Sequence, residues 1–240
     1  MALIDPTSIQ NRLLTSLPAQ ALDDLLPHLR QVQLPHRTIL QKPNEIITSV
    51  HFVESGYVSQ IAMLENGDGA EVGIIGKEGL IGLALILGDD RAFAEILVQA
   101  EGRALELDAD RFLEAIDTNP SVRRIMLRYA MTVFAHVTMT AACNGNHHID
   151  QRIARWLLMA HDRVGKDEFP MTHEFLSMML GVRRAGVTLA AGALQKGGFI
   201  TYDRGRVRVT DRPGLEAVSC ECYDIVQREY QRLLGPGVAA

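Results

Sequence analysis

The feature that most constrains the fold is a long helical pattern in the middle of the chain. From Asn119-Pro120 to about Cys143, apolar residues recur at steps of three and four, with the proline at a first-turn position. Such a helix is roughly 36 Å long at 1.5 Å per residue, too long for the core of a small β domain. It can pack along its own domain or form a coiled-coil seam between two copies, and we favour the seam. The predicted interface residues are Val122, Ile125, Met126, Tyr129, Val133 and Val137.

The chain before this helix changes from a helical to a strand-like pattern. Residues 7–33 have the apolar spacing of short helices. From about 34 to 112, apolar residues alternate, as in SVHFVESGYVSQIAM, and eight glycines fall between Gly56 and Gly88. Asn66-Gly67 separates two alternating runs and predicts a hairpin turn. Short strands with frequent turns predict a β sandwich or barrel.

The chain after the long helix predicts a small helical domain with a hairpin. NGNHH (144–148) is expected to break the helix as a hinge, and a second apolar helical stripe follows it. In MTHEFLSMML, Thr172 is placed to cap a helix that Gly181 ends. A further helix begins near Arg183, and two short strands flank a turn at 203–205. The residues expected to face the core of this domain from that helix are Val187, Leu189, Ala190, Ala193 and Leu194.

Two helices joined by a tight glycine turn indicate a helix-turn-helix, whose second helix enters the major groove of DNA. Arg183 and Arg184 stand at the start of that helix, where its residues meet base edges and its free N–H groups face phosphate. Arginine is the commonest reader of guanine. Arg204, Arg206 and Arg208 on the hairpin are placed to reach neighbouring phosphates. The alternative to a DNA-binding unit is a small fold that carries arginines on its surface without a binding role.

Charge is distributed unevenly along the chain. Residues 1–149 hold 11 basic and 18 acidic residues, whereas residues 150–215 hold 11 basic and 7 acidic residues. The net charge of the whole chain is −5, so the overall balance alone says nothing for nucleic acid. The basic segment coincides with the predicted helix-turn-helix, which modestly favours a polyanionic partner.

Composition excludes several other classes of protein. The chain has 47% hydrophobic and 22% charged residues, as ordinary soluble proteins do, and only three cysteines, which fits a reducing compartment. The N-terminus predicts no signal peptide, and the uncharged segment 129–149 is too polar to span a membrane. No Ser-His-Asp order, phosphate loop or H-E-x-x-H spacing is present, so we expect a cytoplasmic protein that is not an enzyme.

The order of these parts resembles the Crp/Fnr (catabolite activator and fumarate-nitrate regulator) family of bacterial transcription regulators. The similar stretches are VHFVESGYVSQIAM, VGIIGKEGLIGL, NPSVRRIML and MTHEFLSMMLGVRRAGVTLAAGALQKGGFI. The resemblance implies an α+β chain with a cyclic-nucleotide-binding-like β-roll (a jelly roll), a long dimerisation helix and a C-terminal winged helix-turn-helix. It implies a homodimer on a two-fold symmetric operator. The expected boundaries are 1–118, 119–145, 146–215 and, for a C-terminal helical extension, 216–240.

The resemblance also implies roles for individual residues in DNA binding. Arg184 falls on the guanine-reading arginine, and Arg183 on a position that caps the helix and touches phosphate. Ala185 replaces a glutamate that reads cytosine, so the operator is expected to differ from the usual one. Thr172 and His173 match residues that touch phosphate, whereas the neighbouring Glu174 is unfavourable. The remaining predicted DNA contacts are Thr188, Lys196, Arg204 and Arg206. A lysine near a helix end, such as Lys196, is more often a partner of the helix dipole than a phosphate contact.

The predicted effector site departs from the family pattern. Cyclic-nucleotide binders of the family carry a Gly-Glu pair that holds the ribose and an Arg-Ser or Arg-Thr pair that holds the phosphate. Here Gly82 is followed by Leu83, and Arg91 by Ala92. A cyclic phosphate needs charge-assisted donors, so we expect no binding of cyclic AMP or cyclic GMP. The apolar lining favours either a less polar ligand or no effector at all.

Other cofactors of the family are not expected either. The iron–sulfur members need a cluster of cysteines, and none lies before Cys143. Cys220 and Cys222 supply only two sulfurs and are predicted to be ordinary thiols, with a redox or metal role as the lesser alternative. His51 and His136 are predicted to be satisfied structural histidines rather than haem ligands. His147-His148 belong to the hinge, so we expect no cofactor and no metal site.

The sequence is compatible with three kinds of function. The first is a dimeric DNA-binding regulator whose expected partners are double-stranded DNA and a second copy of itself, with an unidentified small-molecule effector and RNA polymerase as further candidates and no membrane. The second is a ligand- or partner-binding regulatory module without specific DNA binding. The third function is that of an enzyme, and no catalytic motif in the sequence supports it. Removal of the arginines at 183, 184, 204 and 206 distinguishes the first two functions, because only the second predicts that function stays intact.

Overall fold

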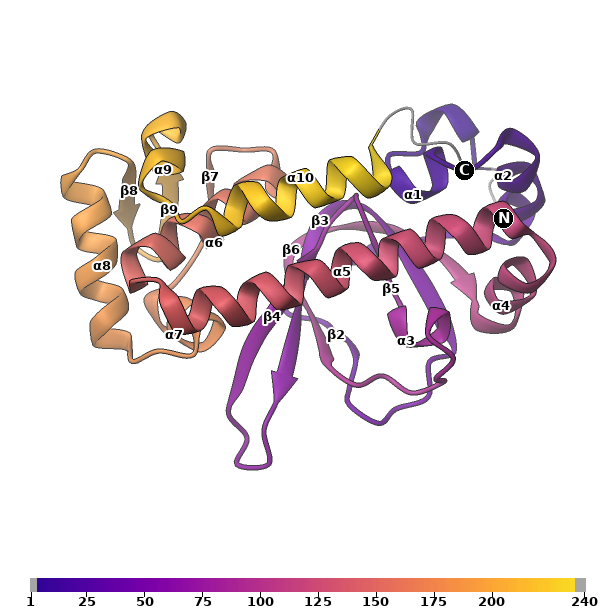
Figure 1. Cartoon of the computed structure of the whole chain (residues 1–240), viewed down its shortest axis with the longest axis horizontal. Coiled ribbons are helices and arrows are strands. Elements are labelled where there is room, and N and C mark those ends of the chain that lie inside the picture. Colours follow the sequence, from indigo (N-terminus) through magenta and orange to yellow (C-terminus); the bar gives the residue numbers. More distant parts are fainter. Residues whose placement is uncertain (1–3, 236–240) are drawn as a thin grey trace.

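The computed structural model describes residues 4–235 and has two domains joined by a long helix. Helix α5 (Pro120–Asn146) runs along the molecule, with the N-terminal β domain against one part of it and the C-terminal domain beyond its other end (Figure 1). Helix α10 (Cys222–Leu234) returns alongside α5, toward the N-terminal helices (Figure 1). The predicted α+β fold, with a β-roll, a long helix and a C-terminal helix-turn-helix, is confirmed.

The β domain is one antiparallel sheet in which two long strands form the centre. Strands β3 (Ser49–Met63) and β6 (Glu95–Asp108) pair along most of their length, in the order β1-β6-β3-β4. The predicted hairpin at Asn66-Gly67 joins β3 to β4, and Gly67 adopts a φ of +85° that favours glycine. The other elements of this domain are η1 (Pro6–Ser8), α1 (Arg12–Thr15), α2 (Ala19–Leu25), η2 (Leu26–His28), β1 (Arg30–Leu34), β2 (Ile39–Gln41), β4 (Gly69–Ile75), β5 (Leu80–Ile81), α3 (Leu83–Ile86) and α4 (Ala109–Thr118).

Helix α5 begins where the sequence predicts. The Asn119 side chain accepts hydrogen bonds from the backbone N–H groups of Ser121 and Val122, which satisfies two free donors of the first turn. The helix continues through Asn144 and Gly145 and ends only at His147, which has an extended backbone. The predicted hinge is therefore shorter than NGNHH, because its first three residues are helical.

The predicted dimer face of α5 is wrong. Val122, Ile125, Met126, Tyr129 and Val133 are buried inside their own chain, together with Phe52, Leu80, Leu105 and Phe112 of the β domain, and Val137 packs at the edge of the same cluster. They cannot contact a second copy while they fill this core. A different stripe of α5 is exposed: Leu127, Met131 and Phe134 keep 50%, 46% and 65% of their surface.

The C-terminal domain combines four helices, α6 to α9, with a small sheet. Its sheet has the order β7-β9-β8, and β8 and β9 form the predicted hairpin around residues 204–205. Val187, Ala190 and Leu194 of helix α8 are buried as predicted, but Leu189 and Ala193 are exposed and Ala191 takes a core position instead. The elements are α6 (Ile149–Val164), β7 (Glu168–Pro170), α7 (His173–Leu180), α8 (Arg184–Lys196), β8 (Ile200–Asp203), β9 (Arg206–Val209) and α9 (Arg212–Val218).

The two domains share a core rather than touching only at the surface. Tyr57 on β3 meets Trp156 on α6 edge to face, with ring centroids 6.5 Å apart. Glu71 on β4 accepts a hydrogen bond from Trp156 Nε1 at 2.5 Å and another from the Ser59 hydroxyl. Arg163 on α6 forms a buried ion pair with Glu78 of the β domain, with Nη2 and Oε1 2.6 Å apart. Within residues 4–235, no helix is both long and apolar enough to cross a membrane.

The buried Glu71 carboxyl predicts that stability falls as pH rises toward neutrality. Burial raises its pKa from 4.5 to about 7, against the opposing effect of the Ser59 and Trp156 hydrogen bonds. The folded state thus binds the proton more tightly than the unfolded state. The stabilisation that the protonated Glu71 carboxyl provides is complete below pH 4.5 and is lost as pH rises through 7. The loss amounts to about 3 kcal/mol.

Glu71→Gln keeps the shape and removes the titration. We expect its free energy of unfolding, measured by denaturant titration between pH 5 and pH 8, to lose this decline relative to the wild type. Glu65→Gln, on the exposed hairpin, is the control and should preserve the wild-type profile. Parallel pH profiles for wild type and Glu71→Gln would contradict the assignment.

Candidate nucleic-acid interface

The helix-turn-helix is built by two local signals. The Thr172 hydroxyl accepts a hydrogen bond from the Phe175 N–H at 3.1 Å and so caps α7. Gly181 ends this helix with a φ of +60°, which a side chain would strain. The backbone N–H groups of Gly181 and Val182 donate to the carbonyls of Met178 and Ser177, which closes the turn. Helix α8 then starts after Arg183.

The first turns of α8 expose the residues predicted to read DNA. Arg183 is the N-cap with an extended backbone, and Arg184 is the first helical residue. Arg183, Arg184, Ala185 and Thr188 are all exposed, and within the described residues neither arginine has an ion-pair partner. Helix α8 lies at one end of the molecule (Figure 1). Their position and charge suit contact with base edges and phosphates.

Leu189 is a surface residue that the sequence pattern placed in the core. It keeps 78% of its surface, on the same helix as the exposed Ala185 and Thr188. On a helix face that meets DNA, a large aliphatic side chain is suited to contact with the methyl group of thymine. The apolar spacing gave no such signal, because Leu189 also fits the apolar stripe of α8.

His173 links α7, α8 and the hairpin. Its Nδ1 lies 3.1 Å from the Thr188 hydroxyl, and its ring packs against Tyr202 with centroids 4.4 Å apart. Burial, and then the charge of Arg184, lower the pKa of His173, so its ring is neutral at pH 7. A neutral His173 orients Thr188 but adds no positive charge for phosphate.

The hairpin arginines differ in how much charge they offer. Arg204 is at the exposed tip with a φ of +45° and, among residues 4–235, has no ion-pair partner. Arg206 and Arg208 both pair with Glu168 of β7, at 2.6 and 2.5 Å, and together they lower the pKa of that carboxyl. Arg206 is thus partly neutralised. Lys196 is exposed in the last turn of α8, roughly 18 Å along the helix from Arg184.

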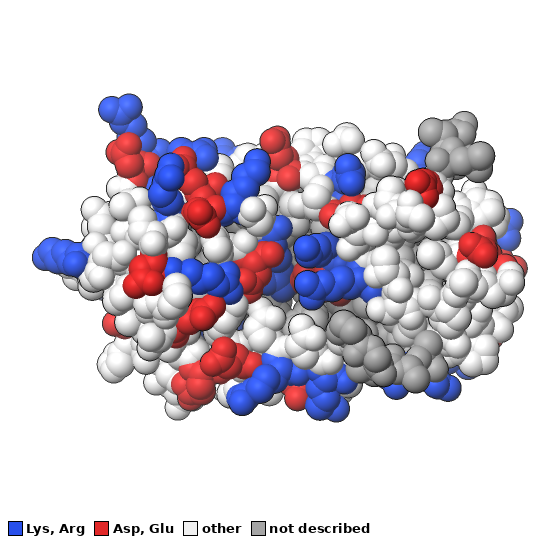
Figure 2. All heavy atoms as spheres, turned by 90° about the horizontal axis from the view of Figure 1, so that it is seen from above, with Lys and Arg blue, Asp and Glu red and all other residues white. Residues whose placement is uncertain are grey.

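A wide groove separates the helix-turn-helix from the β3–β4 hairpin. It has a volume of about 1130 Å³, and Thr172, Glu174 and Arg183 line it opposite residues 67–70. The face that bears α10 has Lys and Arg interspersed with Asp and Glu, without one continuous basic surface (Figure 2). At the end of the molecule that bears α8, Arg183, Arg184 and Arg204 are exposed without an ion-pair partner in the described residues, whereas Arg206 and Arg208 share Glu168.

The predicted effector residues surround very little space. Gly82, Leu83 and Ala92 line a cavity of about 30 Å³, whose other walls include Leu80, Phe93 and Ile96. Arg91 is not part of it: its guanidinium is exposed and donates to the Asn44 carbonyl at 2.8 Å. Leu83 is half-buried rather than fully buried. The cavity has room for about one water molecule, whereas small-molecule sites measure roughly 300–1,000 Å³.

Of the two predicted structural histidines, His136 is buried and His51 is half-buried, and both are incompletely paired. In the described part of the chain, His51 Nδ1 and His136 Nε2 have no hydrogen-bond partner, so these side chains are not satisfied as predicted. Burial is the main cause that lowers the pKa of each ring. Burial therefore favours the neutral form of each ring, and of the two only His136 is fully buried.

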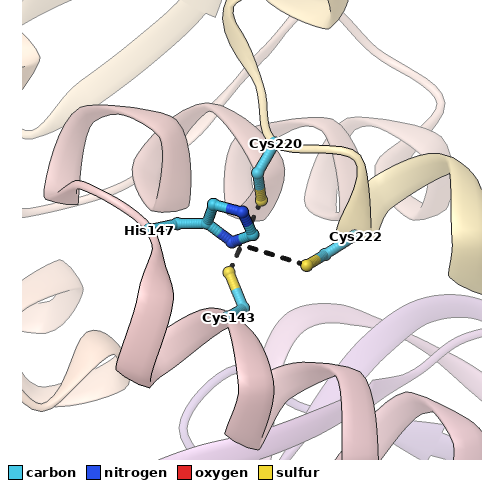
Figure 3. A group of neighbouring side chains, drawn as sticks. All are labelled: Cys143, His147, Cys220 and Cys222. Carbon is cyan, nitrogen blue, oxygen red and sulfur yellow. Dashed lines mark hydrogen bonds between the residues drawn. The ribbon is translucent and has the colours of Figure 1, made fainter.

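One cluster in the described residues could hold a metal ion. Cys143, His147, Cys220 and Cys222 have their ligand atoms within 4.8 Å of one another (Figure 3). The hydrogen bond with Cys220 is the main cause that lowers the pKa of the Cys143 thiol, against the effect of burial. The sequence predicted two unremarkable thiols here, because Cys143 is 77 residues from Cys220 in the chain.

Comparison with known proteins identifies the architecture. Residues 31–119 match the cyclic nucleotide-binding domain, and residues 151–218 match the Crp-like helix-turn-helix domain, so the two matches cover more than half of the chain. No curated protein sequence matches the chain.

Solved structures share the same fold. A putative transcriptional regulator of the Crp/Fnr family from Eubacterium rectale aligns with a TM-score of 0.69 at 19% identity, over 86% of this chain and 96% of that one. FixK2 from Bradyrhizobium japonicum has a TM-score of 0.69 at 14% identity, over 80% and 98%. The c-di-GMP-responsive regulator CLP from Xanthomonas campestris has a TM-score of 0.66 at 18% identity, over 80% of this chain and 99% of that one. With both domains in the expected order, this chain belongs to the Crp/Fnr family and is a DNA-binding transcription regulator.

Proposed function

We propose that the protein acts as a homodimer that binds a two-fold symmetric operator, with one α8 in each of two successive major grooves. The observation that carries this proposal is the exposed N-terminus of α8, where Arg183 and Arg184 extend from a capped helix-turn-helix. Half-sites would then be about one helical turn, or 34–36 Å, apart. Because the proposed partner is duplex DNA, we propose that the protein acts in the cytoplasm.

The exposed stripe of α5 is the proposed dimer seam. Leu127, Met131 and Phe134 are followed by the exposed Thr138 and Ala141, at alternating steps of four and three. This spacing is the heptad pattern of a two-helix coiled coil. Because the opposite side of α5 is buried in its own chain, the seam can use this stripe without disturbing the β domain.

We also propose that the β-roll does not bind a cyclic nucleotide in the family position. Leu83 replaces the carboxylate expected there, Ala92 replaces the hydroxyl, and the cavity of about 30 Å³ is too small for a nucleotide. Responsiveness to c-di-GMP, as described for the Xanthomonas campestris neighbour, is likewise not proposed at this cavity. DNA binding is therefore expected without added ligand.

The test is a selection of random DNA duplexes by the purified protein, without ligand and at two salt concentrations. An enriched palindrome with half-sites one turn apart would support the dimeric regulator. The absence of enrichment from a folded dimer would contradict ligand-independent specific binding. It would leave two accounts: a DNA-binding regulator that needs an effector, or a regulatory module without specific DNA binding.

Arg184→Ala should relax specificity at one base of each half-site. We expect a loss of about 1–3 kcal/mol per half-site, because a bidentate contact to guanine is removed. Binding assays on the selected operator and on single-base variants measure it. Arg204→Ala is the control: it should weaken all sequences alike and reduce the salt dependence, since its predicted partner is phosphate. A uniform loss for Arg184→Ala would contradict its role as a base reader.

A further inference from the structure

Four side chains from three parts of the chain converge where α5 ends. Cys143 is in the last turn of α5, and His147 follows four residues later. Cys220 lies in the link between α9 and α10, and Cys222 is the first residue of α10. Their sulfur and nitrogen atoms point toward a common centre (Figure 3).

The spacing of these atoms matches the coordination shell of one small ion. The sulfurs of Cys143 and Cys220 are 3.5 Å apart, and Cys222 Sγ is 3.6 Å from His147 Nδ1. In a tetrahedral zinc site, with bonds of about 2.3 Å to sulfur and 2.0–2.1 Å to nitrogen, such pairs are roughly 3.8 and 3.5 Å apart. Three sulfurs and one nitrogen around one point suit a single ion better than an iron–sulfur cluster, which wants four thiolates.

His147 is oriented as a metal ligand. Its Nδ1 faces the sulfur of Cys222, while its Nε2 lies 3.2 Å from a carboxylate oxygen of Glu221. With the Nε2 proton held by Glu221, the lone pair of Nδ1 is directed to the centre of the cluster. A carboxylate behind a ligating histidine is a common second partner in zinc sites. Glu221 stands between two of the cysteines in sequence, so the ligand loop also supplies this partner.

Burial and charge around the cluster also fit an ion. The three cysteine side chains are buried, with 1–3% of their surface exposed, and they are free thiols. Three thiolates on a divalent ion leave one net negative charge. Arg152 and Arg155 are close enough for their charges to act on Cys143, and their buried Nε atoms have no hydrogen-bond partner in the described residues. The two guanidinium groups thus supply buried positive charge beside the predicted anionic site.

We propose that Cys143, His147, Cys220 and Cys222 bind one Zn²⁺ in a closed, tetrahedral, structural site. The ion joins the end of α5, the hinge and the start of α10. Helix α6 begins two residues after His147, so the ion also restrains the angle at which the DNA-binding domain leaves α5. This last consequence rests on the proposed function, because it links zinc to operator affinity.

The full-length protein, purified under reducing conditions, provides the test. We expect about one zinc ion per chain by elemental analysis. After zinc is removed, titration with Co²⁺ should produce the absorption bands of tetrahedral thiolate coordination. A reduced, folded protein that takes up no Co²⁺ in this way would overturn the site, and this measurement on the wild type does not depend on a variant folding.

Variants then identify the ligands. Cys222→Ser and His147→Ala should weaken Co²⁺ binding strongly, and Glu221→Gln should weaken it by roughly 10–100-fold. His148→Ala is the matched control, since this neighbouring histidine is exposed and outside the cluster. Equal Co²⁺ binding by wild type and Cys222→Ser would overturn the assignment.

Operator binding is measured separately, with and without zinc. A fall in affinity on zinc removal supports the restraint on the DNA-binding domain, and unchanged affinity overturns that consequence alone. Because metal uptake is observed without DNA, failure of the duplex selection would bear on the proposed function and not on the metal site.

Discussion

Phe134→Glu should convert the protein from a dimer to a monomer and abolish tight binding to a palindromic operator. Phe134 keeps 65% of its surface in the single chain and occupies the centre of the exposed stripe of α5. Burying a phenylalanine contributes about 1.5–3 kcal/mol, and a two-fold interface loses this twice. The substitution also places two carboxylates in an apolar seam. We expect the dimer to weaken by at least ~100-fold.

Sedimentation velocity over a range of concentrations measures this change, and operator binding measures its consequence. Each half-site would then bind a separate chain, so the gain from linking two sites is lost. Phe93→Glu is the matched control, because Phe93 is 68% exposed but belongs to the β domain. The proposed dimer seam would be contradicted if the Phe134→Glu variant stayed dimeric, or if the wild type were monomeric at high concentration.

Arg163→Met should cost about 3–5 kcal/mol of unfolding free energy, because it leaves Glu78 buried without its partner. The Arg163 and Glu78 side chains are only 7% and 12% exposed, and Nη2 and Oε1 are 2.6 Å apart. The pair also joins α6 to the β domain, so the loss should reach both domains. Denaturant titration at pH 7 measures it.

The double variant Arg163→Met, Glu78→Gln should recover much of the loss, since the stranded charge is removed. Arg111→Met provides the control: Arg111 and Glu114 are 2.8 Å apart but more than half exposed, and such pairs contribute at most about 1 kcal/mol. A cost for Arg163→Met no larger than that of Arg111→Met would contradict a stabilising buried pair.

Local signals predicted the helix-turn-helix well. The Thr172 cap and the glycine at 181 act within a few residues of themselves, so the sequence alone located both helices and the turn. The same holds for the start of α5 at Asn119-Pro120 and for the hairpin at Asn66-Gly67. In each case the deciding interaction is a hydrogen bond or a backbone angle that no distant residue controls.

Choices between two faces of one helix could not be made from the sequence. Helix α5 has two apolar stripes, and periodicity detects both without saying which one the β domain covers. The stripe with Tyr129 is buried because Phe52 and Leu80, about 50–80 residues earlier in the chain, pack there. Leu189 was misplaced for the same reason, since spacing along α8 does not show which side the domain core occupies.

The sequence by itself determined the order of domains, the positions of the helices and turns, and the arginines at the start of α8, because short-range hydrogen bonds and backbone preferences decide them. Tertiary structure alone decided which face of α5 is free, how little space surrounds Leu83, and that Cys143 and His147 meet Cys220 and Cys222. These outcomes depend on packing between segments far apart in the chain, and a linear pattern carries no record of which distant surfaces meet.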